Sequence, residues 1–188
     1  TAAPPTAPDV SVLARALERG DAQGPLLIQI ATVHPTSDAT EFRAFGRVLS
    51  GTVSCGQSVK VLGPTYTPEA EEDMAVETVS GVYVAEARYA VHAPGVPAGN
   101  WVLLSGIDAT IAKSATVCDT ALPVADTYVL RPIVHMTESV LKVAIEPLRP
   151  AELPKMLDGL RKVNKCYPLV STRVEESGEH TLLGTGEL

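Results

Sequence analysis

The chain has 188 residues, 45% of them hydrophobic and 4% aromatic, which is enough apolar material for one good core or two small ones. Its formal net charge of -7 comes from the part before residue 128, so no basic field attracts a polyanion and autonomous nucleic-acid binding is disfavoured. Three widely spaced cysteines without a Cys-x-x-Cys pair, and the lack of a signal peptide or long apolar run, exclude a disulfide framework, a zinc site and a membrane span. They predict a soluble protein of a reducing compartment.

Residues 1–24 are predicted to form a linker and one short helix. The segment 1–8 contains three prolines, which remove amide donors, and its other residues supply little to bury. Residues 9–19 place apolar side chains at i, i+3, i+4 and i+7 and are followed by Gly20, a pattern that predicts an amphipathic helix. A helix this short is marginal alone, so we expect it to pack against another part of the chain.

Residues 25–122 are predicted to form a closed β-barrel. Short apolar or alternating runs are separated by glycine and proline without a helical period, a pattern typical of a barrel or a sandwich. The expected strands are residues 26–34, 41–50, 58–62, 74–79, 82–91, 100–105 and 110–118. A barrel is favoured because Gly46 inside a strand and Gly51 just after it suit tight corners. Trp101, the only tryptophan, is predicted to pack in the barrel rather than to stack on a nucleic-acid base.

Residues 128–188 have a mixed pattern. It predicts an extended stretch at 129–146, a helix at 151–165, and strands at 169–174 and 181–185. The helix has one apolar face and basic residues near its end, as the helix dipole favours. Strand, helix, strand, strand is the first part of a split β-α-β fold, and the sequence stops at Leu188 before a second helix and a fourth strand. We therefore expect an incomplete ferredoxin-like domain.

The sequence contains no motif for nucleotide hydrolysis. The G-x-x-x-x-G-K-[ST] loop that binds phosphates does not occur in these residues. Residues 21–24 match only the short D-x-x-G pattern, and Asn164-Lys165 only the start of N-K-x-D, and both matches are common by chance. The four histidines have neither helical pair spacing nor a neighbouring nucleophile.

An acidic cluster near the C-terminus resembles an acid/base or metal site. It consists of Glu175, Glu176, Glu179 and His180. Ser177-Gly178 in its middle marks a hairpin turn, so a charged turn is the preferred interpretation. No catalytic, cofactor-binding or metal-binding residue is predicted for this chain.

Three lysines of the predicted helix are the candidate site residues. Lys155, Lys162 and Lys165 lie with Asp158 on the stripe opposite the apolar face. A stripe of this kind is usually a solvated face, and contact with RNA or an acidic partner is the alternative. The three lysines are therefore a possible partner-contact face.

Five strings resemble the second and third domains of elongation factor 2 and its relatives, in the order of that family. They are residues 41–51 (EFRAFGRVLSG), 56–68 (GQSVKVLGPTYTP), 97–108 (PAGNWVLLSGID), 152–161 (ELPKMLDGLR) and 175–188 (EESGEHTLLGTGEL). Within the family, the amino-acid sequence most resembles the spliceosomal branch, the GTPases of the U5 small nuclear ribonucleoprotein particle. The run KMLDGLRKVNKCYP at 155–168 carries most of this closer resemblance.

The resemblance implies a six-stranded translation-factor barrel followed by a ferredoxin-like domain, and an upstream GTP-binding domain that this fragment lacks. It implies a non-catalytic module that relays the GTP state of the parent protein in pre-mRNA splicing and binds no cofactor itself. The implied partners are the parent's own GTP-binding and C-terminal domains, the large U5 scaffold protein, the particle's RNA helicase and the U5 RNA, in the nucleus. The alternative is the same region of the ribosomal translocase or of its ribosome-assembly relative, in the cytoplasm.

Overall fold

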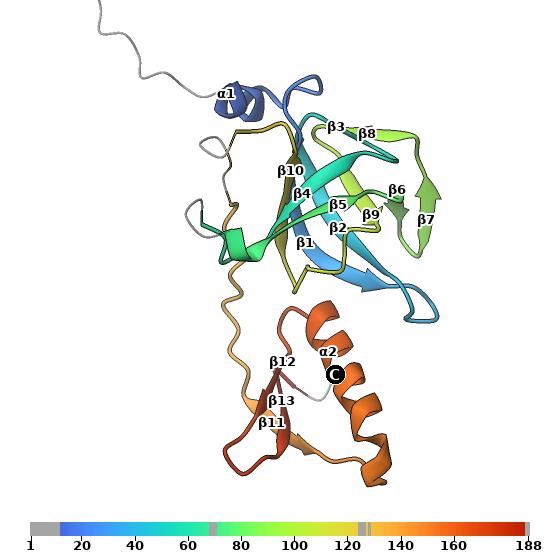
Figure 1. Ribbon diagram of the computed structural model, residues 1–188, viewed down its shortest axis with the longest axis vertical. Helices are drawn as coiled ribbons and strands as arrows, with labels where there is room; N and C mark the ends of the chain where they lie inside the picture. Colours follow the sequence, from blue (N-terminus) through green and yellow to red (C-terminus); the bar gives the residue numbers. More distant parts are fainter. Residues whose placement is uncertain (1–11, 68–70, 124–126, 128, 187–188) are drawn as a thin grey trace, which may run out of the picture.

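The computed structural model describes residues 12–67, 71–123, 127 and 129–186. A β-barrel forms the upper part in Figure 1, and a smaller part with one helix and three strands lies below it. The predicted fold class, mainly β with a barrel followed by a smaller α+β part, is confirmed. The predicted linker at 1–8 lies outside the described residues. Among the described residues, no helix has the length and hydropathy needed to cross a membrane.

The barrel consists of one curled antiparallel sheet and one additional strand pair. The sheet has the order β5-β4-β10-β1-β2-β9-β6-β7, and β3 pairs with β8. The strands are β1 (Leu27–Pro35), β2 (Phe42–Ser50), β3 (Thr52–Ser54), β4 (Ser58–Leu62), β5 (Met74–Thr78), β6 (Gly81–Glu86), β7 (Tyr89–His92), β8 (Gly95–Pro97), β9 (Trp101–Ser105) and β10 (Ala115–Asp119), with the 3-10 turn η1 (Glu71–Asp73) before β5.

One predicted strand is in fact a hairpin. The segment 82–91 was expected to be a single strand, but it contains β6, a turn and β7, with Glu86 paired to Tyr89. The turn residues are Ala87 and Arg88, and Ala87 has a φ of 53°. Turns of this kind usually carry glycine or asparagine at a positive φ, so this sequence gave no turn signal. The hairpin is one reason why the sheet has eight strands instead of the six that the resemblance implied.

The interior of the barrel is a single apolar core. Valines from five strands, Val48, Val59, Val82, Val102 and Val117, each have 0% of their surface exposed and belong to one contact cluster. Strand residues alternate between two faces, so the side chains that point inward from these five strands pack together in this cluster. The interior of the barrel is therefore filled by these apolar side chains.

The short N-terminal helix α1 (Val12–Arg19) packs on the outside of the barrel. Its Leu13 is 1% exposed and shares a second apolar cluster with Leu27, Leu62 and Cys118 of the barrel wall. The prediction that this helix packs against another part of the chain is confirmed.

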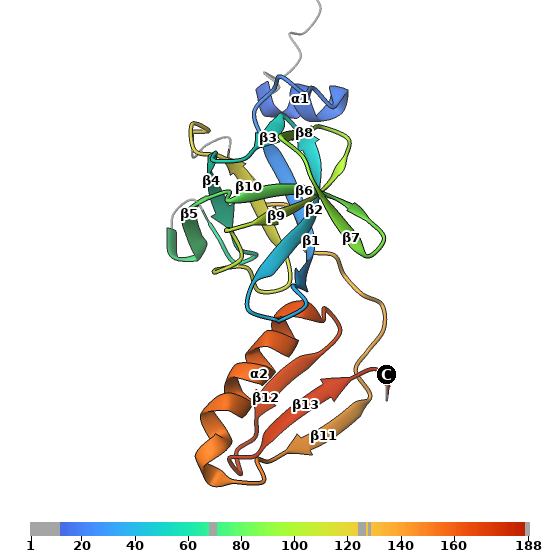
Figure 2. The same ribbon diagram turned by 90° about the vertical axis from the view of Figure 1, so that its right-hand side faces the viewer.

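The smaller part has a three-stranded antiparallel sheet with the order β11-β13-β12. Its elements are β11 (Leu141–Ile145), η3 (Pro150–Glu152), α2 (Leu153–Cys166), β12 (Ser171–Val174) and β13 (His180–Gly184). Helix α2 lies along the sheet and contacts β12 (Figure 2). The predicted turn at Ser177-Gly178 is confirmed, because Gly178 has a φ of 87° and its amide donates to the carbonyl oxygen of Glu175.

Candidate functional site

The C-terminal end of α2 contacts the barrel through a partly buried cation. The Lys165 ammonium lies 2.8 Å from Oδ2 of Asp108, which follows β9, and donates a second hydrogen bond to the Asp108 carbonyl oxygen. The same Nζ lies 4.8 Å from the ring centroid of Phe42 in β2. The Lys165 and Asp108 side chains are only 19% and 25% exposed. This pair is shielded from water, so its attraction is stronger than that of a surface ion pair.

A second lysine contacts the turn after α2 from the barrel side. Lys113 donates to the carbonyl oxygens of Pro168 at 3.2 Å and Val170 at 2.7 Å. Burial lowers the pKa of Lys113. Its backbone has a φ of 77°, a conformation that non-glycine residues adopt only where the surroundings enforce it. These two contacts span 55 and 57 residues of sequence, so they join the two parts of the chain directly.

The last residue of α2 completes the contact. Cys166 packs against the apolar core of the barrel, and its carbonyl oxygen accepts a long hydrogen bond, 3.5 Å, from Oγ1 of Thr32 in β1. Burial raises the pKa of the Cys166 thiol, while the nearby Lys165 charge lowers it. We call the contact of Phe42, Asp108 and Lys113 with residues 165–170 the barrel–helix interface.

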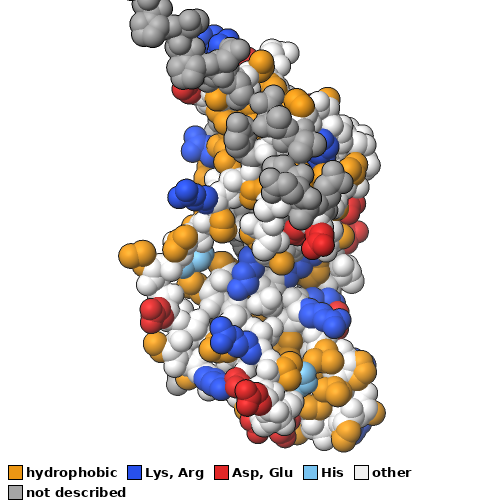
Figure 3. Space-filling model, turned by 60° about the vertical axis from the view of Figure 1, so that its left-hand side comes forward, with side chains coloured by type: hydrophobic (Ala, Val, Ile, Leu, Met, Phe, Trp, Pro, Cys, Tyr) orange, Lys and Arg blue, Asp and Glu red, His pale blue; other side chains and the backbone are white. Residues whose placement is uncertain are grey.

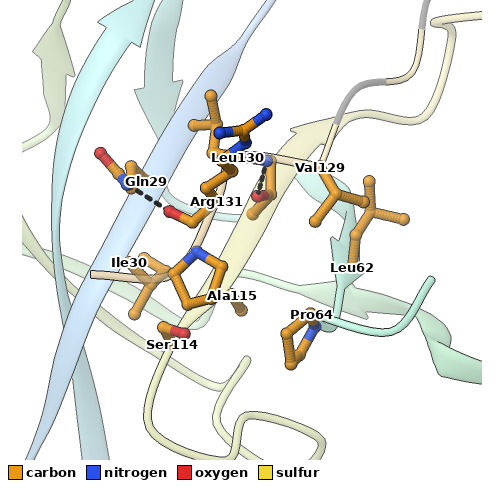
Figure 4. A pocket seen from close by; sticks show the side chains of 11 residues that line it. Gln29, Ile30, Leu62, Pro64, Ser114, Ala115, Val129, Leu130 and Arg131 are labelled. Atoms are coloured by element: carbon orange, nitrogen blue, oxygen red, sulfur yellow. Dashed lines mark hydrogen bonds between the residues drawn. The ribbon is translucent and has the colours of Figure 1, made fainter. Parts of the chain in front are cut away.

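The connecting segment is also fastened to the barrel. The Leu130 amide donates to Oγ1 of Thr116 at 2.9 Å, and the Gln29 side chain donates to the carbonyl oxygen of Arg131 at 3.3 Å. Figure 4 shows residues 129–131 lying across β1 and β10, with both hydrogen bonds drawn. The path from β10 to the smaller part is therefore held against the barrel wall at its start.

The three cysteines differ in burial, and this gives a direct test of the fold. Cys55 is exposed and Cys118 is buried, and burial raises the pKa of Cys118 to about 11. At pH 8 only about a thousandth of such a thiol is ionised. We expect a thiol reagent at pH 8 to modify Cys55 first, Cys166 more slowly, and Cys118 only after unfolding, as read by mass spectrometry of peptides. Early modification of Cys118 would contradict the packing of β10 against α1.

The structure separates the three predicted site lysines. Lys155 is exposed, and Lys162 forms an exposed i,i+4 ion pair with Asp158 at 3.0 Å. Lys165 does not belong with them on a solvated stripe, because it turns to the barrel and contacts Asp108. The sequence offered no signal for Asp108, Lys113 or Phe42, which are far from α2 along the chain. Figure 3 shows Lys and Arg side chains spaced among hydrophobic and neutral ones on one face of the molecule.

The remaining sequence candidates have structural explanations. The Asp21 carboxylate accepts from the Gln23 amide at 2.9 Å, and the Asp21 carbonyl accepts from the amides of Gly24 and Gly51, so residues 21–24 form the turn before β1. The amides of Gln23 and Gly24 are thus occupied within this turn. Glu175 bonds to Lys142 at 2.8 Å. No group of three or more metal-binding side chains occurs in the part of the chain that the structure describes.

Trp101 lies on the barrel surface and not in its interior. It is 48% exposed and stacks on Phe45 with a centroid distance of 5.0 Å and an interplanar angle of 8°. Strand β9 alternates its side chains, so Val102 and Leu104 enter the core and Trp101 points outward. Trp101 was predicted to pack in the barrel, and the structure shows such packing only in its contact with Phe45.

Comparison with known proteins agrees with this architecture. Residues 42–118 match the family model of Elongation factor Tu domain 2. The chain is 50% identical over 168 residues to the "109 kDa U5 small nuclear ribonucleoprotein component GFL" and to the "110 kDa U5 small nuclear ribonucleoprotein component CLO", both of Arabidopsis thaliana. It is 54% identical over 164 residues to "Pre-mRNA-splicing factor cwf10" of Schizosaccharomyces pombe.

These matches cover most of this chain but little of the relatives. The aligned residues are 89% of the chain for the two plant proteins and 87% for the yeast protein, and in each case 17% of the relative. The chain thus spans about a sixth of the length of the curated relatives that it matches. Identity of one half over almost the whole chain, together with the matched family model, leads to one conclusion. The chain is a homologue of these U5 components and of the splicing factor cwf10, and residues 42–118 belong to the Elongation factor Tu domain 2 family.

Proposed function

We propose that the chain is a non-catalytic module of an elongation factor 2-like GTPase that works in the U5 small nuclear ribonucleoprotein particle during pre-mRNA splicing, in the nucleus. In this proposal residues 25–122 are the second domain of that protein, and residues 128–188 are the first part of a ferredoxin-like third domain. The order β11-β13-β12, with α2 between β11 and β12 along the chain, supports this division. GTP is bound by another domain of the parent protein.

The module acts by transmitting domain position. In the proposal, the barrel packs against the GTP-binding domain, and a change of nucleotide moves the barrel and the third domain together. The barrel–helix interface is the observation that carries this idea. Lys165 binds Asp108 of the barrel through a partly buried ion pair, and Lys113 of the barrel donates to two carbonyl oxygens after α2. Such contacts favour one relative orientation of the two parts over others.

The proposed partners are those that the family resemblance implies. We propose contact with the parent's own GTP-binding and C-terminal domains, the large U5 scaffold protein, the particle's RNA helicase and the U5 RNA. Lys155 and Lys162 remain candidates for a partner-contact face, since both stand on the exposed side of α2. Lys165 contributes indirectly, through the orientation of α2.

Capture from nuclear extract tests the proposal. The immobilised 188-residue chain is expected to enrich U5 RNA and U5 proteins over ribosomal RNA and proteins, as read by sequencing and mass spectrometry. The single variants Lys155→Glu and Lys162→Glu are each expected to capture less if that face contacts a partner, while Arg149→Glu, which makes the same charge change, serves as the matched control. Enrichment of ribosomes over U5 components would contradict the spliceosomal assignment. Saturable binding of fluorescent GTP at micromolar concentration would contradict the proposal that the chain is a non-catalytic module.

A further inference from the structure

The strand β7 is an edge of the main sheet, and nothing in the described residues pairs with its outer side. The sheet order ends at β7. The Ala93 amide donates to the carbonyl oxygen of Val82, so alternation along an antiparallel pair directs the amides and carbonyls of Ala90 and His92 away from β6. These two residues therefore offer a short row of donors and acceptors to an added strand.

This edge lacks the features that usually protect an edge strand. Natural sheets block their edges with lysine, proline, bulges or a covering segment. The β7 sequence Tyr-Ala-Val-His has no lysine or proline and pairs with β6 in unbroken register. Its apolar side chains are open to solvent, with Tyr89 63% and Val91 46% exposed. An unprotected edge with exposed apolar side chains is typical of an interaction site.

A cavity of about 320 Å³ lies beside this edge. Its charged lining residues are Arg43 and Arg88, with His34, and it contains no acidic side chain. Aromatic rings of Phe45 and Tyr89 form part of its wall, and the three alanines of the β6–β7 hairpin leave the space open. A cavity with this lining accepts an anionic side chain that has an apolar stem.

The two arginines are already oriented by aromatic rings. The Arg43 guanidinium lies 4.4 Å from the Tyr83 ring centroid, and that of Arg88 lies 5.3 Å from the Tyr89 centroid. The Nε of Arg43 is buried and has no hydrogen-bond partner among the described residues. A buried donor without an acceptor is uncommon and costs stability. A carboxylate that enters the cavity can pair with the guanidinium groups of Arg43 and Arg88, which line it.

We propose that β7 and this cavity form a docking site for an extended acidic peptide segment of a partner protein. The segment adds as a further strand at the outer edge of β7, pairing with Ala90 and His92. One of its carboxylate side chains enters the cavity toward Arg43 and Arg88. This interaction is independent of the barrel–helix interface and of the proposed function, since it depends only on barrel residues.

Selection from a peptide library tests the site. Random twelve-residue peptides displayed on phage are selected on the 188-residue chain, and the enriched peptides are synthesised and titrated by fluorescence anisotropy. We expect the enriched peptides to carry an aspartate or glutamate within a run of β-branched residues. Arg88→Glu and Ala90→Pro are each expected to weaken their binding at least tenfold, whereas Arg149→Glu, the same charge change in the smaller part, leaves it within twofold.

Hydrogen exchange distinguishes strand addition from other modes of binding. The peptide is expected to slow exchange of the Ala90 and His92 amides, while the amides of Tyr89 and Val91, which face β6, change little. Proline is tolerated at an edge position whose amide faces outward, so thermal unfolding of Ala90→Pro verifies that the variant is folded. The proposal is overturned if no acidic peptide is enriched, or if both variants bind as the parent chain does. It is also overturned if a uridine oligonucleotide, and no peptide, binds in an Arg88-dependent manner.

Discussion

Replacing Asp108 by asparagine is expected to speed thiol modification of Cys166 about tenfold. The change removes the anionic partner of Lys165, whose ammonium lies 2.8 Å from Oδ2 of Asp108. It leaves a largely buried cation with only neutral acceptors. Loss of one partner of a fully buried pair costs about 3–5 kcal/mol, but these side chains are 19% and 25% exposed, so about 1–2 kcal/mol is expected here. A difference of about 1.4 kcal/mol is tenfold in the population of the open state.

The readout is the modification rate of Cys166 between pH 7 and pH 10, with Cys55 of the same molecule as the exposed reference. Opening of the barrel–helix interface raises the rate at every pH, whereas a changed thiol pKa shifts the profile along the pH axis. The matched control is Asp158→Asn, which removes the carboxylate of the exposed Lys162 pair. It is expected to leave the Cys166 rate unchanged, because surface pairs of this kind contribute about 0.3–0.5 kcal/mol.

Equal Cys166 rates in the Asp108→Asn and Asp158→Asn variants would contradict the barrel–helix interface as a stabilising contact. Small-angle scattering of the same variants gives an independent measure. In the parent chain the two parts are expected to keep one relative orientation, and in Asp108→Asn the radius of gyration is expected to increase. These two measurements also test the proposed transmission of domain position, because a barrel–helix interface that opens freely cannot keep the two parts in one orientation.

Gly46→Ala is expected to destabilise the barrel by about 3 kcal/mol. Gly46 lies in β2 opposite Ile30 of β1, and a Cβ atom there would lie 2.4 Å from the carbonyl oxygen of Gln29 and 2.8 Å from Cδ1 of Ile30. The first of these atoms is backbone and cannot move without disturbing the register of β1 and β2. The pairing between these strands already shifts between Ile30 and Thr32, so the strands have little freedom to move apart here.

Urea unfolding followed by Trp101 fluorescence measures this effect, since the only tryptophan is in the barrel. Gly159→Ala is the control, because a Cβ atom at Gly159 in α2 meets nothing within 4 Å. There the substitution is expected to raise helix stability by up to about 1 kcal/mol. A Gly46→Ala chain that unfolds within 0.5 kcal/mol of the parent, by the ordinary tolerance of surface sites, would mean that β1 and β2 do not approach this closely.

Local patterns in the sequence predicted most elements. Within residues 25–122, the strands β1, β2, β4 and β9 lie at nearly the bounds that the alternating apolar residues predicted. The helical spacing of apolar residues in 151–165 correctly predicted α2. The strand expected at 110–118 is shortened to β10 at Ala115–Asp119, because residues 110–114 form bends and an isolated bridge. The extended stretch expected at 129–146 contains only the strand β11, because its first part lies along the barrel wall instead of pairing in a sheet.

The missed elements have two physical reasons. β3 and β8 have three residues each, too few for an alternation to be recognised. The β6–β7 hairpin turns at Ala87, whose positive φ is imposed by the pairing of β6 with β7. A turn enforced by tertiary pairing leaves no glycine or asparagine in the sequence, so pattern alone cannot locate it.

The site depended on contacts that are remote in sequence. Lys165 was identified as a candidate from its helical stripe, but its partner Asp108 lies 57 residues away, and no local spacing connects the two. Lys155 and Lys162 stay on the exposed side as the stripe predicted. Asp108 and Lys113 occur in a loop whose composition has no chemical signature.

The sequence by itself determined the class of the fold, the family resemblance and the succession of barrel and α+β part, because alternation, helical period and turn residues are local properties. It also determined that these residues hold no phosphate-binding loop. Only the tertiary structure decided which charges are shielded, which strand edge is open, and where the end of α2 meets the barrel. The barrel–helix interface joins residues that lie 55 or more positions apart in the sequence, and the open edge follows from the order of the strands in the sheet. Burial changes the strength of each charge interaction, and local sequence does not reveal burial.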